Sequence, residues 1–244
     1  SNIAGIDDFG RYLDYVAKNE SGIIPLNLGT SRDDSLDRPF EAEMRWFPIL
    51  DYTTSPLAVS IDDEECKVFN KFDTPEYEAH FKKMREWAQK GYWSQSALSN
   101  QIMPTESLKN GNSASSMWNI LKFNETYMQI KEQEPTWDLR FFDASPGWSY
   151  VHPYLVNAVA IPSSAANPER ALMLLDLLKN DRDYFNLTTY GIEGKHFEIT
   201  GDNKLKVLDA EAFGPDSSCP WGWRNEEFYL DYEGSYPNLQ QIRD

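Results

Sequence analysis

Apolar positions recur along this chain at two spacings, which predict helices alternating with strands. Phe9, Leu13 and Val16 fall on one face of an otherwise polar segment, which predicts a helix over 6–18. Short apolar runs between turn residues predict strands, and the runs at 57–61 and 67–72 should pair around an acidic turn. The other predicted helices cover 75–90 and 122–132, and the other predicted strands cover 114–118, 139–142 and 154–161. Such alternation is typical of an α/β fold in which helices flank a mostly parallel or mixed sheet.

The most strongly patterned helix is predicted to begin after Asn167. Asn167 is suited to cap the helix, Pro168 to the first helical position, and Glu169 to the first turn, where the helix dipole favours negative charge. Apolar residues follow at helical spacing and should pack as a wide stripe against a sheet or another helix. The stripe consists of Leu172, Leu175 and Leu178, flanked by Met173, Leu174 and Leu177.

Two glycines follow this helix and predict a backbone that turns sharply. Gly191 and Gly194 are separated by two residues, and glycine adopts positive φ at little cost. Phe197 and Ile199 then alternate with polar residues ahead of a turn at 201–203, which predicts a short hairpin. A phosphate-binding loop is excluded, because that motif needs four residues between its glycines.

These residues resemble a signature of a known family. Asn-Pro-Glu at 167–169 and Tyr-Gly-Ile-Glu-Gly-Lys-His-Phe at 190–197 are similar to the C-terminal signature of bacterial extracellular solute-binding proteins (family 1) of ABC importers. The resemblance is strongest to the Gram-positive lipoprotein branch, although Phe197 stands where that branch has tyrosine. The segment 72–92 resembles the family's mid-chain helix. The turn at 107–111 resembles a further family segment, although Asn112 follows it where lysine is usual.

The resemblance implies non-catalytic capture of an extracellular solute, most often a sugar or oligosaccharide, for delivery to an ABC transporter permease, with no cofactor. It implies that residues 1–244 are one α/β lobe of a two-lobed, periplasmic-binding-protein-like type II fold about twice as long. The signature helix and hairpin, 167–207, lie within that lobe. It also implies a cell-surface lipoprotein of a Gram-positive bacterium, held to the membrane only by a lipid anchor on an N-terminal part missing here.

Charge narrows the classes of partner. The 244 residues carry a formal net charge of −16, with 23 Lys and Arg against 39 Asp and Glu. Phosphate contacts need a basic face, so nucleic-acid binding is excluded, and adsorption to an anionic membrane is disfavoured. No apolar run reaches the roughly 18 residues that a membrane-spanning helix needs.

Aromatic residues supply the candidate ligand site, because flat rings stack on the apolar face of a sugar while polar neighbours bond its hydroxyls. Trp118 is predicted to end a strand, Trp148 lies in a turn-rich loop, and Arg224 could bond a hydroxyl or carboxylate. The alternative is that the segment around Arg224 packs a hinge against the missing lobe. The candidate ligand-binding residues are Trp118, Asn119, Trp148, Tyr150, Trp221, Trp223 and Arg224. Trp46 is a weaker candidate.

Other tryptophans are predicted to be structural. Trp87 lies in the helix 75–90 and should pack in the core together with Phe81 and Met84. Trp93 and Trp137 are expected to do the same.

The alternative function is that of a glycan-active hydrolase or a carbohydrate-binding module. A hydrolase needs two carboxylates about 5–10 Å apart. Asp51, Asp138 and Asp143 lie near predicted strand ends, but their spacing defines no pair.

The sequence contains no clear pattern for a metal site or a reactive cysteine. The three histidines, at 80, 152 and 196, lack metal-ligand spacing, so no metal is expected. Cys66 and Cys219 fit a disulfide or, preferably, two buried thiols.

Overall fold

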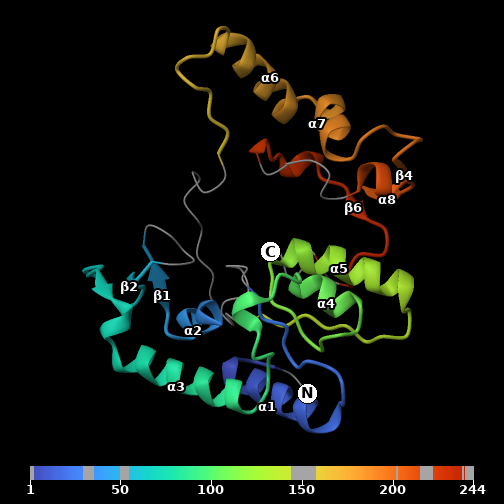
Figure 1. The fold of residues 1–244 in the computed structure, drawn as a ribbon. Coiled ribbons are helices and arrows are strands. Elements are labelled where there is room, and N and C mark those ends of the chain that lie inside the picture. Colours follow the sequence, from blue (N-terminus) through green and yellow to red (C-terminus); the bar gives the residue numbers. More distant parts are fainter. Residues whose placement is uncertain are drawn as a thin grey trace. The chain divides into compact units, whose positions relative to one another are not determined.

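The computed structural model describes residues 3–29, 36–49, 55–143, 158–201, 203–214, 222–237 and 239. The chain divides into two compact units, Ser1–Ser149 and Tyr150–Asp244 (Figure 1). Each unit joins helices to a small sheet, so the predicted mixed α/β class is confirmed. That residues 1–244 form a single lobe stays a prediction. Within the described ranges, no helix has the length and apolar composition needed to cross a membrane.

The first unit combines helices with an antiparallel sheet of three strands. The strands are β1 (Trp46–Pro48), β2 (Leu57–Ser60) and β3 (Phe69–Asn70), and β2 lies in the middle. The pairs Phe47 with Val59 and Ala58 with Phe69 fix its register. The helices are α1 (Ile6–Asn19), α2 (Asp37–Glu43), α3 (Pro75–Gln89), α4 (Pro104–Lys109) and α5 (Ile120–Gln133).

The second unit pairs two helices with a mixed sheet. The helices α6 (Pro168–Asn180) and α7 (Arg182–Thr189) contact each other, and Asp181 caps α7 by accepting hydrogen bonds from the N–H groups of Asp183 and Tyr184. Strand β4 (Phe197–Gly201) pairs antiparallel with β5 (Lys204–Val207), and β5 pairs parallel with β6 (Asp231–Tyr232). The short helix α8 (Ala210–Phe213) follows β5.

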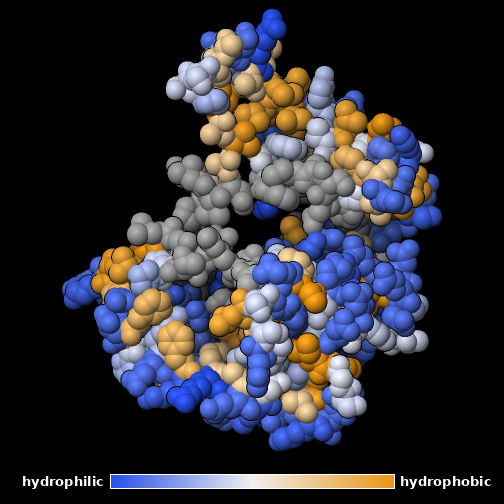
Figure 2. All heavy atoms as spheres, viewed as in Figure 1, coloured by the Kyte–Doolittle hydropathy of each residue, from blue (hydrophilic) through white to orange (hydrophobic). Residues whose placement is uncertain are grey.

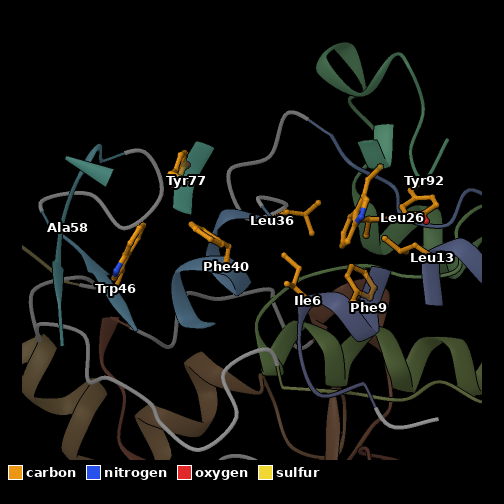
Figure 3. Close-up of a cluster of buried hydrophobic side chains, with 11 residues drawn as sticks. Ile6, Phe9, Leu13, Leu26, Leu36, Phe40, Trp46, Ala58, Tyr77 and Tyr92 are labelled. Atoms are coloured by element: carbon orange, nitrogen blue, oxygen red, sulfur yellow. The ribbon is translucent and has the colours of Figure 1, made fainter. Parts of the chain in front are cut away.

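A cluster of buried side chains holds the first unit together (Figure 3). Helix α1 contributes Phe9 and Leu13 from the predicted face. Gly10 lets α3 approach α1, because a Cβ there would lie 2.4 Å from Cζ2 of Trp87. The first cluster consists of Ile6, Phe9, Leu13, Leu26, Leu36, Phe40, Trp46, Ala58, Tyr77, Trp87 and Tyr92.

The second unit has its own core, the second cluster, of Phe185, Tyr190, Phe197, Leu205 and Leu230. The Tyr190 hydroxyl accepts a hydrogen bond of 2.8 Å from the Leu230 N–H, which ties the end of α7 to the segment before β6. Burial of a large apolar side chain such as Phe185 or Leu205 stabilises a fold by about 1.5–3 kcal/mol.

The predicted helices are confirmed. Helices over 6–19, 75–89, 120–133 and 168–180 match the predictions closely, and Trp87 and Met84 lie in or against the first cluster. Phe81 was expected to point inward, but its side chain is 54% exposed. It lies beyond the buried face of α3 and rests edge-on against Tyr77 at 4.8 Å.

The hairpin predictions are confirmed, but three single-strand predictions are wrong for the described residues. Strands β2 and β3 pair as predicted, and so do β4 and β5. The segments 114–118, 139–142 and 158–161 contain no strand. Two isolated hydrogen bonds hold the segment 114–118 instead. The Ala114 N–H donates to the Ile24 carbonyl, and the Ser115 hydroxyl donates to the Pro25 carbonyl. Residues 154–157 lie outside the described residues.

The helix α6 differs from the prediction in two ways. Asn167 occupies the cap position, but its side chain accepts no cap hydrogen bond. The predicted stripe is only partly packed, because Leu178 is buried while Leu172 and Leu174 are exposed. The six apolar residues go most of the way around the helix, and its contact with α7 covers only one side.

Candidate functional site

Trp118 and Asn119 lie together where α5 begins. Asn119 is the N-cap of α5, and its Oδ1 accepts a hydrogen bond of 3.0 Å from the Lys122 N–H. Trp118 is partly buried, and the preceding Met117 packs against the first cluster. The segment is further fixed by the Tyr12 hydroxyl, which donates to the Ala114 carbonyl at 2.8 Å. The Trp118 side chain is therefore partly exposed next to the exposed Asn119, on a segment that is fixed to the first unit.

Trp223 and Arg224 lie together in the second unit. Trp223 packs partly buried against the second cluster, and its buried Nε1 has no hydrogen-bond partner among the described residues. Gly222 lies close to the segment before α6, since a Cβ there would be 3.0 Å from Val159 Cγ2. Arg224 is exposed. Since an indole N–H is a donor that normally finds an acceptor when buried, Trp223 has an unused hydrogen-bonding group.

The loop after Arg224 is anchored to α6 and α7. Asn225 donates from Nδ2 to the Lys179 carbonyl at 2.9 Å and accepts from the Glu227 N–H at 3.1 Å. Arg182 donates to the Glu227 carbonyl at 3.3 Å, and its guanidinium carbon lies 4.6 Å from the Phe228 ring centre. These contacts fix the backbone from which Arg224 extends.

The predicted site residues therefore form two pairs. Trp118 and Asn119 belong to the first unit, whereas Trp223 and Arg224 belong to the second. The predicted ligand contacts at Trp148, Tyr150 and Trp221 lie outside the described residues.

Two of the three tryptophans expected to be structural lie in or against the first cluster, whereas the expected core packing of Trp137 is wrong. Trp87 is buried in the first cluster, and Trp93 packs against it. Trp46, the weaker ligand candidate, is also buried in the first cluster, where its ring meets that of Phe40 at 5.6 Å. Trp137 is 38% exposed, and its ring lies against Gly111, where a Cβ would be 2.9 Å from Cη2.

The signature turn, residues 190–197, is built around the imidazole of His196. Its Nδ1 accepts a hydrogen bond of 3.0 Å from the Ile192 N–H, and its ring stacks on Phe213 with centres 5.5 Å apart. Gly191 has a φ of +90°, and a Cβ there would lie 2.4 Å from His196 Nδ1. The signature residues thus form a packed turn.

A small cavity adjoins the signature turn. It has a volume of about 10 Å³ and is lined by Thr189, Tyr190, His196, Phe213 and Tyr232 among others. The buried hydroxyl of Thr189 has no partner among the described residues. This volume suits about one water molecule and is too small for a sugar ring.

The first unit contains a largely buried polar network that no local sequence pattern indicates, formed by Asp37, Glu41, Lys71, Tyr77 and His80. Asp37 accepts from the Tyr77 hydroxyl at 2.7 Å and lies 3.0 Å from His80 Nε2, whose ring stacks on Phe40. Lys71 and Glu41 form a buried ion pair.

Burial and hydrogen bonding shift the pKa values of the two carboxyl groups in this network in opposite directions. Burial raises the pKa of Glu41, although Lys71 partly offsets the effect. Burial also acts to raise the pKa of Asp37, but hydrogen bonds from His80 and Tyr77 outweigh it and hold that pKa below its ordinary value. Burial and the neighbouring Asp37 raise the pKa of Tyr77. An Asp–His pair can serve in acid–base chemistry, but His80 is only 3% exposed, so this network fits a structural role better.

The residues proposed for the other chemistries are also placed. Asp138 is exposed and bonds to Arg140, which holds the pKa of Asp138 below its ordinary value, and Asp51 lies outside the described residues. Cys66 is an exposed thiol in a turn with φ of +49°, so the expected burial is wrong, and Cys219 lies outside the described residues. Throughout the described ranges, no three His, Cys, Asp or Glu side chains gather as metal ligands.

Comparison with known proteins finds solved structures of similar fold but no matching sequence family. No family model matches the chain, and no curated protein matches it. Solved structures of ABC-transporter solute-binding proteins share its fold at low sequence identity. The N-glycan transport solute-binding protein of Streptococcus pneumoniae is 14% identical with a TM-score of 0.67, over 99% of this chain and 51% of that chain.

Two further structures have the same relation to the chain. The Streptococcus pneumoniae protein in complex with Man1GlcNAc is 15% identical with a TM-score of 0.63, over 99% of this chain and 52% of that chain. An HMO-binding, ABC-transporter-associated solute-binding protein of Bifidobacterium longum infantis is 15% identical with a TM-score of 0.51, over 98% and 50%. The chain thus spans about half the length of these structures, and its fold is that of ABC-transporter solute-binding proteins.

Proposed function

We propose that this chain is part of a non-catalytic binding protein that captures a carbohydrate outside a bacterial cell for an ABC importer. The observation that carries the proposal is the fold, shared over 98–99% of the chain with solute-binding proteins whose names specify N-glycan transport or HMO binding. The Streptococcus pneumoniae protein has also been solved in complex with Man1GlcNAc and, in a further structure, with Man5GlcNAc. An oligosaccharide is therefore the ligand class proposed here.

The proposed ligand contacts combine flat aromatic surface with fixed polar groups. Trp118 and Trp223 each offer a partly exposed indole ring. Arg224 is exposed on an anchored backbone and can donate two parallel hydrogen bonds to neighbouring oxygen atoms. Asn119 supports Trp118 by capping α5. Trp148, Tyr150 and Trp221 complete the proposed set.

The wider setting of the proposal follows the resemblance to the signature. The natural protein would have two lobes that close on the sugar, and the closed form would be recognised by the permease. It would be a family 1 binding protein, anchored by a lipid at the surface of a Gram-positive bacterium. Residues 1–244 would be one lobe of it.

The test is thermal unfolding of the full-length natural protein against mono- and oligosaccharides, with peptides and amino acids as controls. A ligand at 100 times its Kd stabilises the folded state by about 2.7 kcal/mol and raises the midpoint. Arg224→Gln should reduce the rise, whereas Arg85→Gln, which changes an exposed arginine of α3, should not. No rise with any carbohydrate would contradict the proposal.

The recovered sugar separates the proposal from a glycan-active hydrolase. A binding protein returns the oligosaccharide intact after prolonged incubation, whereas a hydrolase shortens it. Mass spectrometry of the recovered sugar distinguishes the two, and cleavage that is lost on changing a single carboxylate would overturn the non-catalytic assignment.

A further inference from the structure

An apolar face of α6 is left uncovered by the rest of the described chain. Met173, Leu174 and Leu177 are 66%, 51% and 38% exposed. Leu177 lies four residues after Met173 and three after Leu174, so it shares one side of the helix with both. These three residues are the outer apolar face, and Figure 2 shows apolar atoms gathered over α6 in the upper part of the view.

The outer apolar face is distinct from the side of α6 that packs within its own unit. Leu178 is buried, while Ala171 and Leu175 are partly buried, and these three share a different side. Helix α6 contacts α7. A surface helix normally has one apolar side and one polar side, and a helix that is apolar nearly all round is normally buried. The residue pattern of α6 therefore predicts packing contacts on two sides of the helix.

We propose that the outer apolar face of α6 packs against polypeptide from the half of the two-lobed fold that these 244 residues do not contain. The likeness to the solved structures covers 99% of this chain but only 51% of the chain it matches, so the shared fold includes about as much polypeptide again. An uncovered apolar helix face within such a partial fold is where further packing is expected.

The chemistry of the face specifies its occupant. The surface that packs on the three apolar side chains should itself be an apolar face of a helix or sheet, because a charge buried against them would have no partner. Arg170 is exposed and lies three and four residues before Met173 and Leu174, so it flanks the face on the same side. The covering surface should therefore be apolar at its centre and acidic or polar where it meets Arg170.

Oxidation of Met173 by hydrogen peroxide tests the proposal directly. In the 244-residue chain, Met173 should oxidise readily, with the exposed Met103 of the first unit as internal reference. In the full-length natural protein, Met173 should oxidise slower relative to Met103 by a factor of roughly ten or more, because a contact open about a tenth of the time slows the reaction that much. Equal relative rates in both proteins would overturn the proposal.

Three other results would also overturn it. Met173 that is already protected in the 244-residue chain, independently of concentration, would show that residues of this chain cover the face. Protection that grows with concentration would show that a second copy covers it. A gene that encodes nothing beyond these residues would exclude the proposed occupant.

A matched pair of variants tests the same face by stability. Leu174→Gln should lower the thermal midpoint of the full-length protein by several degrees and that of the 244-residue chain by little. Leu172→Gln is the control, since Leu172 is a 59% exposed leucine of the same helix that lies off the outer face. Equal effects of the two variants in the full-length protein would contradict the proposal. Neither readout requires a ligand, so the result stands apart from the test of carbohydrate binding.

Discussion

Replacing Gly191 with alanine should destabilise the second cluster through two separable effects. Gly191 lies near the start of the signature turn that follows α7 and has a φ of +90°, a backbone conformation that residues with a Cβ rarely adopt. An added Cβ would also lie 2.4 Å from His196 Nδ1 and 3.0 Å from His196 Cβ. The imidazole of His196 cannot move freely, because it accepts a hydrogen bond from the Ile192 N–H and its ring stacks on that of Phe213.

The two effects have different sizes. Left-handed backbone costs a residue with a Cβ about 1–2 kcal/mol. Forcing an extra methyl group into packed surroundings costs about 1–3 kcal/mol more. Gly191→Ala should therefore lower the free energy of unfolding by about 2–5 kcal/mol in total.

Gly194→Ala is the matched control. Gly194 belongs to the same turn and has a φ of +77°, but nothing lies within 4 Å of its added Cβ. It should show the backbone cost alone, about 1–2 kcal/mol. The gain from a less flexible unfolded chain is common to both variants and cancels in the comparison.

Native-state hydrogen exchange of the amides in 197–207 is the suitable assay, because it reports opening of the second unit without contribution from the first. Gly191→Ala should lower protection more than Gly194→Ala, and adding His196→Ala should remove part of the difference. Equal losses of protection in the two glycine variants would refute the role given to His196.

Three further predictions concern the first unit. Gly10→Ala should cost about 1–3 kcal/mol by urea unfolding, because the added methyl meets the Trp87 ring, and no loss would contradict the close approach of α1 and α3. Lys71→Met should cost about 3–5 kcal/mol by leaving Glu41 buried without its partner, and the double variant with Glu41→Gln should recover much of this loss. The lowered pKa of Asp37 stabilises the fold above its ordinary value of 3.8, and that stabilisation is lost as pH falls through the folded pKa. Asp37→Asn should therefore lower stability at neutral pH and weaken its decline in acid, and an unchanged decline in urea titrations would contradict this assignment.

The helices could be predicted because their determinants lie close together in sequence. Thr74 caps α3 by accepting from the Tyr77 N–H, and Pro75 follows at the first helical position. The face of α1 formed by Phe9, Leu13 and Val16 is fixed by spacing alone. Each of these features is visible within a single helix, without knowledge of its neighbours.

The strands and the polar network depended on distant residues. Whether the segment 114–118 forms a strand depends on its partners near Ile24 and Pro25, about ninety residues earlier in the chain. Asp37 and His80 are 43 positions apart, so no local pattern joins them. The outer apolar face of α6 was visible as apolar residues, but only the structure showed that they stay exposed.

The candidate ligand residues follow from side-chain chemistry, and their role in binding stays a prediction. The anchor behind Arg224 could not be predicted, because it joins Asn225 to the Lys179 carbonyl of α6, 46 positions away. The Asn119 cap beside Trp118 is instead a local feature, since it joins residues three apart.

The most direct test of the proposed function is calorimetric titration of the full-length natural protein with oligosaccharides. We expect saturable binding of one glycan class, weakened by Arg224→Gln and by Trp118→Ala, with the sugar recovered intact. The absence of binding to every carbohydrate tested, or release of a shortened sugar, would contradict the account.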